Sequence, residues 1–363
     1  IFSNAVNALR NTFVAQLMER DIAWACRGTP PARDEFRTST TRIVETVEAA
    51  RACVEELVDA EWVTIDTETS GIQWEPSFRV ELATLVAKGS REGWTFTRAA
   101  LEDSAIRQVF ALAVNVAPMA GQNTKYDWLS LRADPLLRDL VGRPYIGIDT
   151  RVMTKLLNGH ESDGHLAVMA ETIGMGGHKA EAQDALEAVR KDLARLAAEP
   201  YQKPLKPTKK NPTGARPPYV PRAIMRAQGG DPSVPQHTLD DIWQKRCGVD
   251  GYAYRYLPSP VGERYNARDA VSTTIIAEDH ERRVAAAPHL VNVWHGVQRD
   301  ELNALARMEE VGIGFDRDAN DLFVAHLHAE LQATAAAMAP YTGTANPDEC
   351  GGIINSTKQL PEL

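Results

Sequence analysis

The stretch Trp62-Val63-Thr64-Ile65-Asp66-Thr67-Glu68 decides how the rest of the sequence is interpreted. Its first four residues are apolar or β-branched and predict a short strand. Asp66 and Glu68 then place two carboxylates at the C-terminal end of that strand, where an α/β sheet presents its ligand sites. The signal is weak by itself, because many strands end in an acidic turn, so the surrounding sequence has to support it.

Further strands follow this stretch closely. Val80 to Ala87 and Trp94-Thr95-Phe96 are β-runs, and Gly71, Gly89 and Gly93 lie between or beside them. Three successive strands with short connections predict an antiparallel meander. Next come a helical pattern at Leu101 to Val116 and a candidate short strand at Pro118-Met119-Ala120. Another helix begins at Trp128-Leu129, and a candidate last strand is Ile146-Gly147-Ile148. This order predicts an α/β fold with a mixed sheet flanked by helices.

Two more segments carry residues suited to catalysis. In Gly121-Gln122-Asn123-Thr124-Lys125-Tyr126-Asp127, the last residue starts a predicted helix, whose dipole would stabilise a carboxylate without any catalytic role. Tyr265-Asn266-Ala267-Arg268-Asp269 lies in a helical pattern. Its four-residue spacing puts the phenol of Tyr265 and the carboxylate of Asp269 on one helix face, one turn apart. Each segment alone also has an ordinary structural explanation.

Together and in this order, the three segments resemble the exonuclease motifs of the DEDD superfamily, in its tyrosine-containing DEDDy subclass. The sequence resembles family A DNA polymerases of the bacterial polymerase I type still more closely. That resemblance includes Ile65 to Thr69, the run 121 to 127, and Asp149-Thr150 followed by Leu156-Leu157-Asn158. Residues 306–316 and 355–360 resemble the opening of the polymerase thumb. No palm or fingers motif of that family occurs in the sequence, so we expect no nucleotide addition.

The resemblance implies a ribonuclease H-like exonuclease fold and a proofreading 3′→5′ exonuclease with two divalent metal ions, Mg²⁺ or Mn²⁺. Two such ions activate water and stabilise the leaving 3′ oxygen, and hard cations call for oxygen ligands. By this resemblance, Asp66 bridges both ions, and Glu68 and Asp269 complete the site that activates water. Asp127 holds the second ion, and Tyr265 orients the attacking water. The implied substrate contacts are Asn123, Gln122, Lys125 and Ile72, although ordinary packing explains Ile72 equally well.

The expected domains are an N-terminal helical extension (1–58), the exonuclease domain (59–290) and the start of the polymerase thumb (291–363). An insertion at 176–236 departs from the bacterial pattern. Within it, Ala180 to Glu199 has an amphipathic helical pattern. Pro200 to Gly230 has seven basic residues, no acidic ones, and many prolines, which exclude a regular helix or a central strand. This basic segment either follows a DNA backbone or forms a solvated Pro-rich loop.

Composition restricts the remaining functions. The chain has 363 residues and a formal charge of −9, which argues against coating nucleic acid by bulk attraction but not against a cation-holding carboxylate site. The four widely spaced cysteines disfavour zinc and disulfide frameworks. No apolar run reaches membrane-spanning length and no signal pattern is present. We therefore expect a cytoplasmic protein of a bacterium or a phage-infected cell, without a membrane partner.

The expected partners are a single-stranded DNA 3′ end or primer terminus and a polymerase domain in the same or a cleaved chain. Two other functions remain open. One is a stand-alone exoribonuclease like ribonuclease D, which the thumb-like sequence disfavours. The other is a catalytically silent scaffold that holds DNA, which the presence of all four motif carboxylates disfavours.

Overall fold

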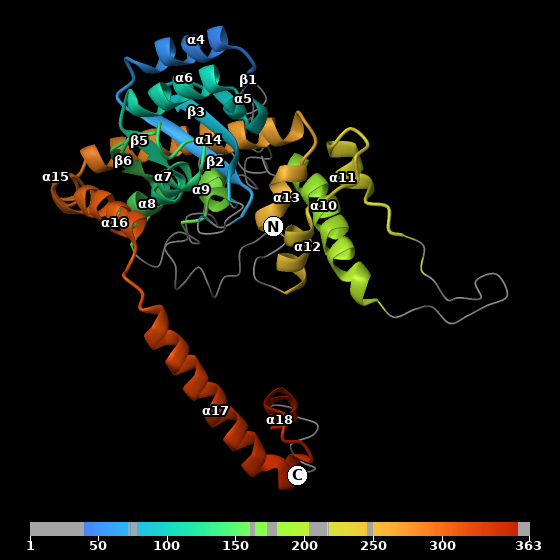
Figure 1. Cartoon of the computed structure of the whole chain (residues 1–363). Helices are drawn as coiled ribbons and strands as arrows, with labels where there is room; N and C mark the ends of the chain where they lie inside the picture. Colours follow the sequence, from blue (N-terminus) through green and yellow to red (C-terminus); the bar gives the residue numbers. More distant parts are fainter. Residues whose placement is uncertain are drawn as a thin grey trace, which may run out of the picture. The chain divides into compact units, whose positions relative to one another are not determined.

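The computed structural model describes residues 40–71, 73, 78–159, 164–172, 180–202, 216, 218–244 and 250–354. The chain forms two compact units, one that extends to Glu310 and one that begins at Val311 (Figure 1). The helical pattern expected before Thr40, the residue Ile72 and the thumb-like run 355–360 lie outside the described residues. All other predicted site residues belong to the first unit.

A six-stranded mixed sheet forms the centre of the first unit, in the order β1-β4-β3-β2-β5-β6. β3 runs antiparallel to β2 and β4, whereas the other neighbouring strands pair in parallel. The predicted meander and the mixed sheet of a ribonuclease H-like fold are therefore confirmed. The strands are β1 (Thr40–Val44), β2 (Val63–Thr69), β3 (Val80–Ala87), β4 (Glu92–Thr97), β5 (Met119–Gly121) and β6 (Ile146–Asp149).

The edge strand β1 contradicts one prediction. Helical spacing places Ile43 on the same helix as Val47, but Ile43 belongs to β1, which pairs in parallel with β4. Helix α4 (Val47–Leu57) begins only after Thr46, whose side chain accepts the backbone N–H of Ala49 at 3.2 Å. The helix prediction is right from Val47 onward and wrong before it, because a capping threonine separates a β-branched strand from the helix.

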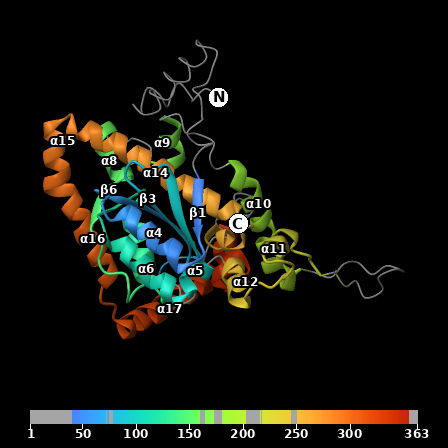
Figure 2. The same cartoon turned by 90° about the horizontal axis from the view of Figure 1, so that it is seen from above.

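Helices cover both faces of the sheet (Figure 2). Residues of one helical group pack into the main apolar core against β2, β3 and β4: α4, α5 (Arg98–Glu102), α6 (Ser104–Asn115) and α7 (Thr124–Ala133). A second group lies on the other face: α14 (Val261–Ala285), α8 (Thr150–Asn158) and α9 (Leu166–Thr172). The single helix predicted from Leu101 to Val116 is two helices, because the Asp103 carboxylate caps α6 at the N–H groups of Ala105 and Ile106.

The residues of β2 alternate between these two helical layers. Val63 and Ile65 are buried in the main core. Thr64 faces α14, where its hydroxyl oxygen accepts a hydrogen bond from Thr274 at 2.7 Å. Because side chains of a strand point to opposite faces in turn, Asp66 and Glu68 continue the row that begins with Thr64. The fold thus presents both carboxylates to α14.

The insertion at 176–236 contributes α10, η1 and α11 to a second helical cluster, which the helices that follow the insertion complete. The predicted stripe of Leu186, Val189 and Leu193 on α10 is buried, in a cluster that includes residues of α11, α12, α13 and α14. The elements are α10 (Ala180–Ala198), the 3₁₀ turn η1 (Glu199–Tyr201), α11 (Arg222–Ala227), α12 (Gln236–Trp243), α13 (Asp250–Ala253) and the 3₁₀ turn η2 (Tyr254–Tyr256).

The described parts of the basic, Pro-rich segment are packed. The buried Asp192 of α10 accepts hydrogen bonds from the Tyr219 hydroxyl and from the N–H groups of Ala223 and Ile224. Tyr201 stacks on Trp243 with ring centroids 4.2 Å apart. The exclusion of helix from this segment is wrong at α11, because its prolines end before that short helix begins. Residues 203–215 lie outside the described residues, so both predicted roles of the basic side chains there stay predictions.

Shorter elements complete the chain. After α14 come α15 (Pro288–Val293), the π-helical turn η3 (Trp294–Gln298) and α16 (Arg299–Val311). The second unit contains α17 (Arg317–Thr342) and α18 (Pro347–Ile354). Within the part of the chain that the structure describes, no helix is both long and apolar enough to cross a membrane.

Candidate metal centre

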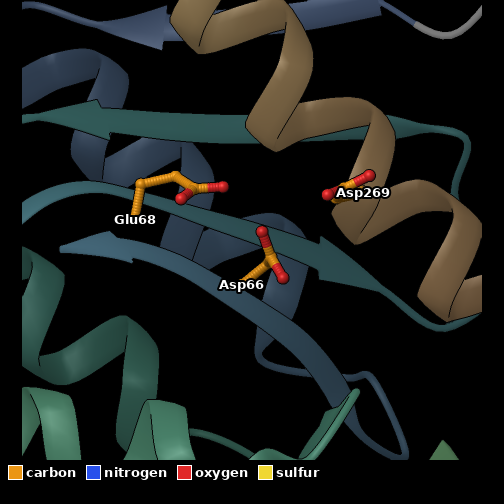
Figure 3. A group of neighbouring side chains, drawn as sticks. All are labelled: Asp66, Glu68 and Asp269. Atoms are coloured by element: carbon orange, nitrogen blue, oxygen red, sulfur yellow. The ribbon is translucent and has the colours of Figure 1, made fainter. Parts of the chain in front are cut away.

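Three carboxylates converge where β2 meets α14 (Figure 3). Asp66 and Glu68 come from β2, and Asp269 comes from α14. One oxygen of each carboxylate lies within 4.8 Å of the others. Glu68 and Asp269 are buried, and Asp66 is partly exposed. Three negative groups at this distance repel one another, and a hard divalent cation with oxygen ligands relieves that repulsion. The donor set therefore fits Mg²⁺ or Mn²⁺.

Asn266 clamps the central carboxylate from α14. Its side-chain amide donates to Asp66 Oδ2 at 2.6 Å and to the Asp66 carbonyl at 3.3 Å. Its amide oxygen accepts the Thr84 hydroxyl of β3 at 2.5 Å. Asn266 is fully buried, so both ends of its amide are fixed by these partners. Asn266 was not predicted as a site residue, and its sequence signal is limited to its position beside Tyr265 in the segment 265–269.

Tyr265 lies beside the carboxylates, as the one-turn spacing from Asp269 predicts. Its side chain is buried, and its ring is stacked on that of Tyr254 with centroids 5.8 Å apart. Burial, followed by the negative charges of Asp269 and Glu68, raises the pKa of the Tyr265 phenol above its ordinary range. Burial and these charges therefore favour the neutral, protonated phenol at this position.

Asp127 is in a different environment from the other three carboxylates. It lies on α7, is buried, and accepts hydrogen bonds from the Thr67 N–H at 2.9 Å and the Thr67 hydroxyl at 2.7 Å. Thr67 belongs to the row of β2 that faces away from α14. Burial, together with the charge of Asp149, raises the pKa of Asp127 to about 7. The structure does not bring Asp127 into the three-carboxylate group, and its role as ligand of a second ion stays a prediction.

Asp149 holds the start of α7 in place from β6. Its carboxylate accepts the N–H of Thr124 at 2.9 Å and the N–H of Val152 at 3.0 Å, which joins the first turns of α7 and α8. Asn123 precedes α7 in the left-handed region, with φ 60°, and its side chain makes no capping hydrogen bond. Gln122 donates to the Gly164 carbonyl. These contacts give Gln122 a structural role and fix the backbone that carries Asn123.

Of the two remaining predicted substrate residues, the structure describes only Lys125. Lys125 forms an ion pair with Glu309 of α16, with its Nζ 2.5 Å from Oε1. Ile72 lies outside the described residues. Substrate contact by Gln122, Asn123, Lys125 and Ile72 stays a prediction.

A cavity of about 420 Å³ lies at the opposite end of the sheet from the carboxylates. Its lining includes Trp62 and Pro118, which directly precede β2 and β5, and Glu281 near the end of α14. Glu68 is six positions beyond Trp62 along an extended strand, which corresponds to about 20 Å. The cavity is therefore a separate feature from the candidate metal centre.

Comparison with known proteins gives a partial likeness to nucleases. No protein-family model and no curated protein matches the sequence. Similar solved structures include ribonuclease D of Trypanosoma brucei bound to GMP, with 12% identity, a TM-score of 0.34, and coverage of 44% of this chain and 48% of that one. A mutant catalytic core of RRP6 from the same organism has 14% identity, a TM-score of 0.36, and coverage of 74% and 53%.

A third similar structure is Trypanosoma brucei ribonuclease D in complex with RNA U12. It has 12% identity, a TM-score of 0.33, and coverage of 63% of this chain and 66% of that one. The chain thus spans about half to two thirds of the length of these structures. The fold assignment rests on the strand order and strand directions described above.

Proposed function

We propose that this chain is a metal-dependent 3′→5′ exonuclease that hydrolyses the terminal phosphodiester of a nucleic acid strand. The observation that carries the proposal is the convergence of Asp66, Glu68 and Asp269 beside the buried phenol of Tyr265. When bound, two divalent ions would supply a hydroxide nucleophile and neutralise charge on the phosphate and the leaving oxygen. The chain's own residues would hold, orient and enclose that reaction.

Each residue has a distinct part in this proposal. Asp66, which Asn266 fixes by a hydrogen bond of 2.6 Å, would be the ligand shared by the ions. Glu68 and Asp269 would complete the site where water is activated. Tyr265 would position that water through its hydroxyl, because a protonated phenol is a neutral, directional partner. Asp127 would hold a second ion through Oδ2, because its Oδ1 accepts both hydrogen bonds from Thr67.

Two substrates fit this chemistry. The sequence resemblance to family A polymerases supports a proofreading exonuclease that removes nucleotides from a DNA 3′ end. The alternative, a ribonuclease D-like enzyme that acts on RNA, uses the same carboxylates and tyrosine. Trypanosoma brucei ribonuclease D has been solved in complex with RNA U12. We therefore propose the exonuclease reaction for either substrate, and a direct comparison of DNA cleavage with RNA cleavage distinguishes the two.

The test is single-turnover cleavage of end-labelled single-stranded DNA and RNA with Mg²⁺, Mn²⁺ or EDTA. We expect stepwise shortening from the 3′ end, with no cleavage in EDTA. Asp66→Ala should abolish cleavage, while Asp59→Ala, which removes an exposed carboxylate just before β2, should leave it unchanged. Tyr265→Phe should lower the rate by roughly tenfold to a thousandfold, because it removes only a positioning group.

Circular dichroism has to show that every variant is folded. A folded Asp66→Ala variant with the wild-type rate would refute the metal centre. A chain that binds single-stranded DNA but cleaves neither substrate with any metal would instead support the silent scaffold.

A further inference from the structure

A second tyrosine is coupled to the proposed catalytic tyrosine. Tyr254 lies in η2, eleven positions before Tyr265 in the sequence, and the two rings are stacked with centroids 5.8 Å apart and planes inclined by 29°. The two phenol groups act on each other, and both lie within the electrostatic influence of Glu68 and Asp269. Tyr254 therefore contacts Tyr265 through its ring, and its hydroxyl acts on the Tyr265 phenol next to the carboxylates.

We propose that Tyr254 is a positioning residue that fixes the phenol of Tyr265, and that the helical insertion holds Tyr254 in place. This inference rests on the proposed exonuclease function. A tyrosine side chain has two rotatable bonds, so an isolated phenol on α14 can swing its hydroxyl away from the carboxylates. A stacked ring restricts that rotation, and the interaction with a second phenol orients the hydroxyl itself. Water held by the hydroxyl is then held in one place.

The insertion supplies the support behind this pair. Tyr265 belongs to the same buried apolar cluster as Leu186, Val189 and Leu193 of α10, and Tyr254 packs against that cluster. The charge of Arg190, also on α10, acts on the Tyr254 phenol. Helix α10 of the segment that departs from the bacterial pattern thus packs in the same apolar cluster as Tyr265. The segment's described helices have a direct structural connection to the proposed reaction.

Tyr256 provides a matched control two residues away. It lies in the same 3₁₀ turn and the same apolar cluster, and its side chain is fully buried. Among the described residues, its hydroxyl has no hydrogen-bond partner. Tyr256→Phe therefore removes a hydroxyl that is more deeply buried than that of the partly buried Tyr254 and has no hydrogen-bond partner among the described residues.

The experiment compares Tyr254→Phe and Tyr256→Phe in the full chain by single-turnover cleavage and by steady-state kinetics. We expect Tyr254→Phe to lower kcat about tenfold, in line with a misplaced reacting group, with KM changed less than about twofold. Tyr256→Phe should leave both constants within about twofold of wild type. Added to Tyr265→Phe, the Tyr254→Phe change should have no further effect, because its only target is then absent.

Three results would overturn the inference: a Tyr254→Phe variant with wild-type kcat, equal losses in both single variants, or a loss that adds fully to that of Tyr265→Phe. Nuclear magnetic resonance of chains with labelled tyrosine rings gives a readout that does not need activity. The Tyr265 ring signals should shift in Tyr254→Phe and stay in place in Tyr256→Phe. Unchanged Tyr265 signals in Tyr254→Phe refute the positioning role. Lack of cleavage by the wild-type chain refutes only the proposed function.

Discussion

Replacing Asn266 by alanine should weaken metal binding more than it weakens the fold. The Asn266 amide donates to Asp66 Oδ2 at 2.6 Å, and alanine at this position has no donor to take its place. A hydrogen bond to a charged group contributes about 1.5 to 3 kcal/mol. Groups that orient a metal ligand typically change metal affinity by about 10-fold to 100-fold when they are removed. Since 1.4 kcal/mol corresponds to tenfold, the two magnitudes agree.

The measurement is the Mg²⁺ concentration that gives half-maximal cleavage, supported by calorimetric titration with Ca²⁺. Asn266→Ala should raise that Mg²⁺ concentration by about 10-fold to 100-fold and leave the rate at saturating Mg²⁺ within a few fold. Asn303→Ala is the matched control. Asn303 is also a buried asparagine that clamps a strand, through hydrogen bonds of 2.9 and 3.0 Å to the backbone of Ile146, but it lies on α16 away from the carboxylates.

Both variants should lose stability, because each leaves buried polar groups without a partner. Only Asn266→Ala should change the metal dependence. An equal shift of the Mg²⁺ requirement in both variants would mean that loss of stability, and not the loss of one donor to Asp66, weakens metal binding. An unchanged Mg²⁺ requirement in a folded Asn266→Ala variant would refute the clamp.

Two further predictions concern stability. Burial lowers the pKa of His280 from 6.5 to about 4, so between these pH values the unfolded chain binds a proton that the folded chain does not bind. Acidification from pH 8 to 5 should therefore lower the free energy of unfolding by about 2 kcal/mol through this group. In urea unfolding, the stability of His280→Gln should depend correspondingly less on pH. Arg98 donates to the buried Asp134 at 2.7 Å, and Arg98→Ala should cost about 3 kcal/mol in the same assay. Lys191→Ala, which breaks an exposed pair with Glu187, should change stability far less. A flat His280 comparison, or equal losses in the two ion-pair variants, would contradict these assignments.

The sheet could be predicted from the sequence because its signals are local. The meander of β2, β3 and β4 follows from β-branched runs separated by short glycine-containing connections. The sequence predicts Asp66 and Glu68 just after an apolar strand, and β2 instead continues through them to Thr69. The four-residue spacing of Tyr265 and Asp269 predicts their common face on α14. These features need only the period of a helix or a strand.

Features that depend on contacts between distant segments were not predicted. Asn266 looks like any polar residue within a helix, because Asp66, its partner, is 200 positions away. Tyr254 lies in a 3₁₀ turn that has no motif of its own, and its importance depends on the ring of Tyr265. Asp127 lies at the start of a helix, as its motif predicts. Its partner is Thr67, because strand alternation points Thr67 of β2 away from α14 and toward Asp127. Periodicity places a side chain on a face, whereas its partner depends on how the faces pack.

The hydroxyl groups of the sheet show how far such packing extends. A continuous row of hydrogen bonds runs from Thr41 of β1 through Thr95 and Thr84 to Asn266, with distances of 2.8, 2.8 and 2.5 Å, and Asn266 then binds Asp66. A buried hydroxyl without a partner is costly, so each member of the row fixes the next. The edge strand that helical spacing failed to predict is therefore connected to the central carboxylate of the candidate metal centre. The Thr84 hydroxyl donates to the amide oxygen of Asn266, and this bond keeps the amide N–H of Asn266 oriented toward Asp66. The geometry of the proposed metal site therefore depends on a row of side chains that begins three strands away from β2.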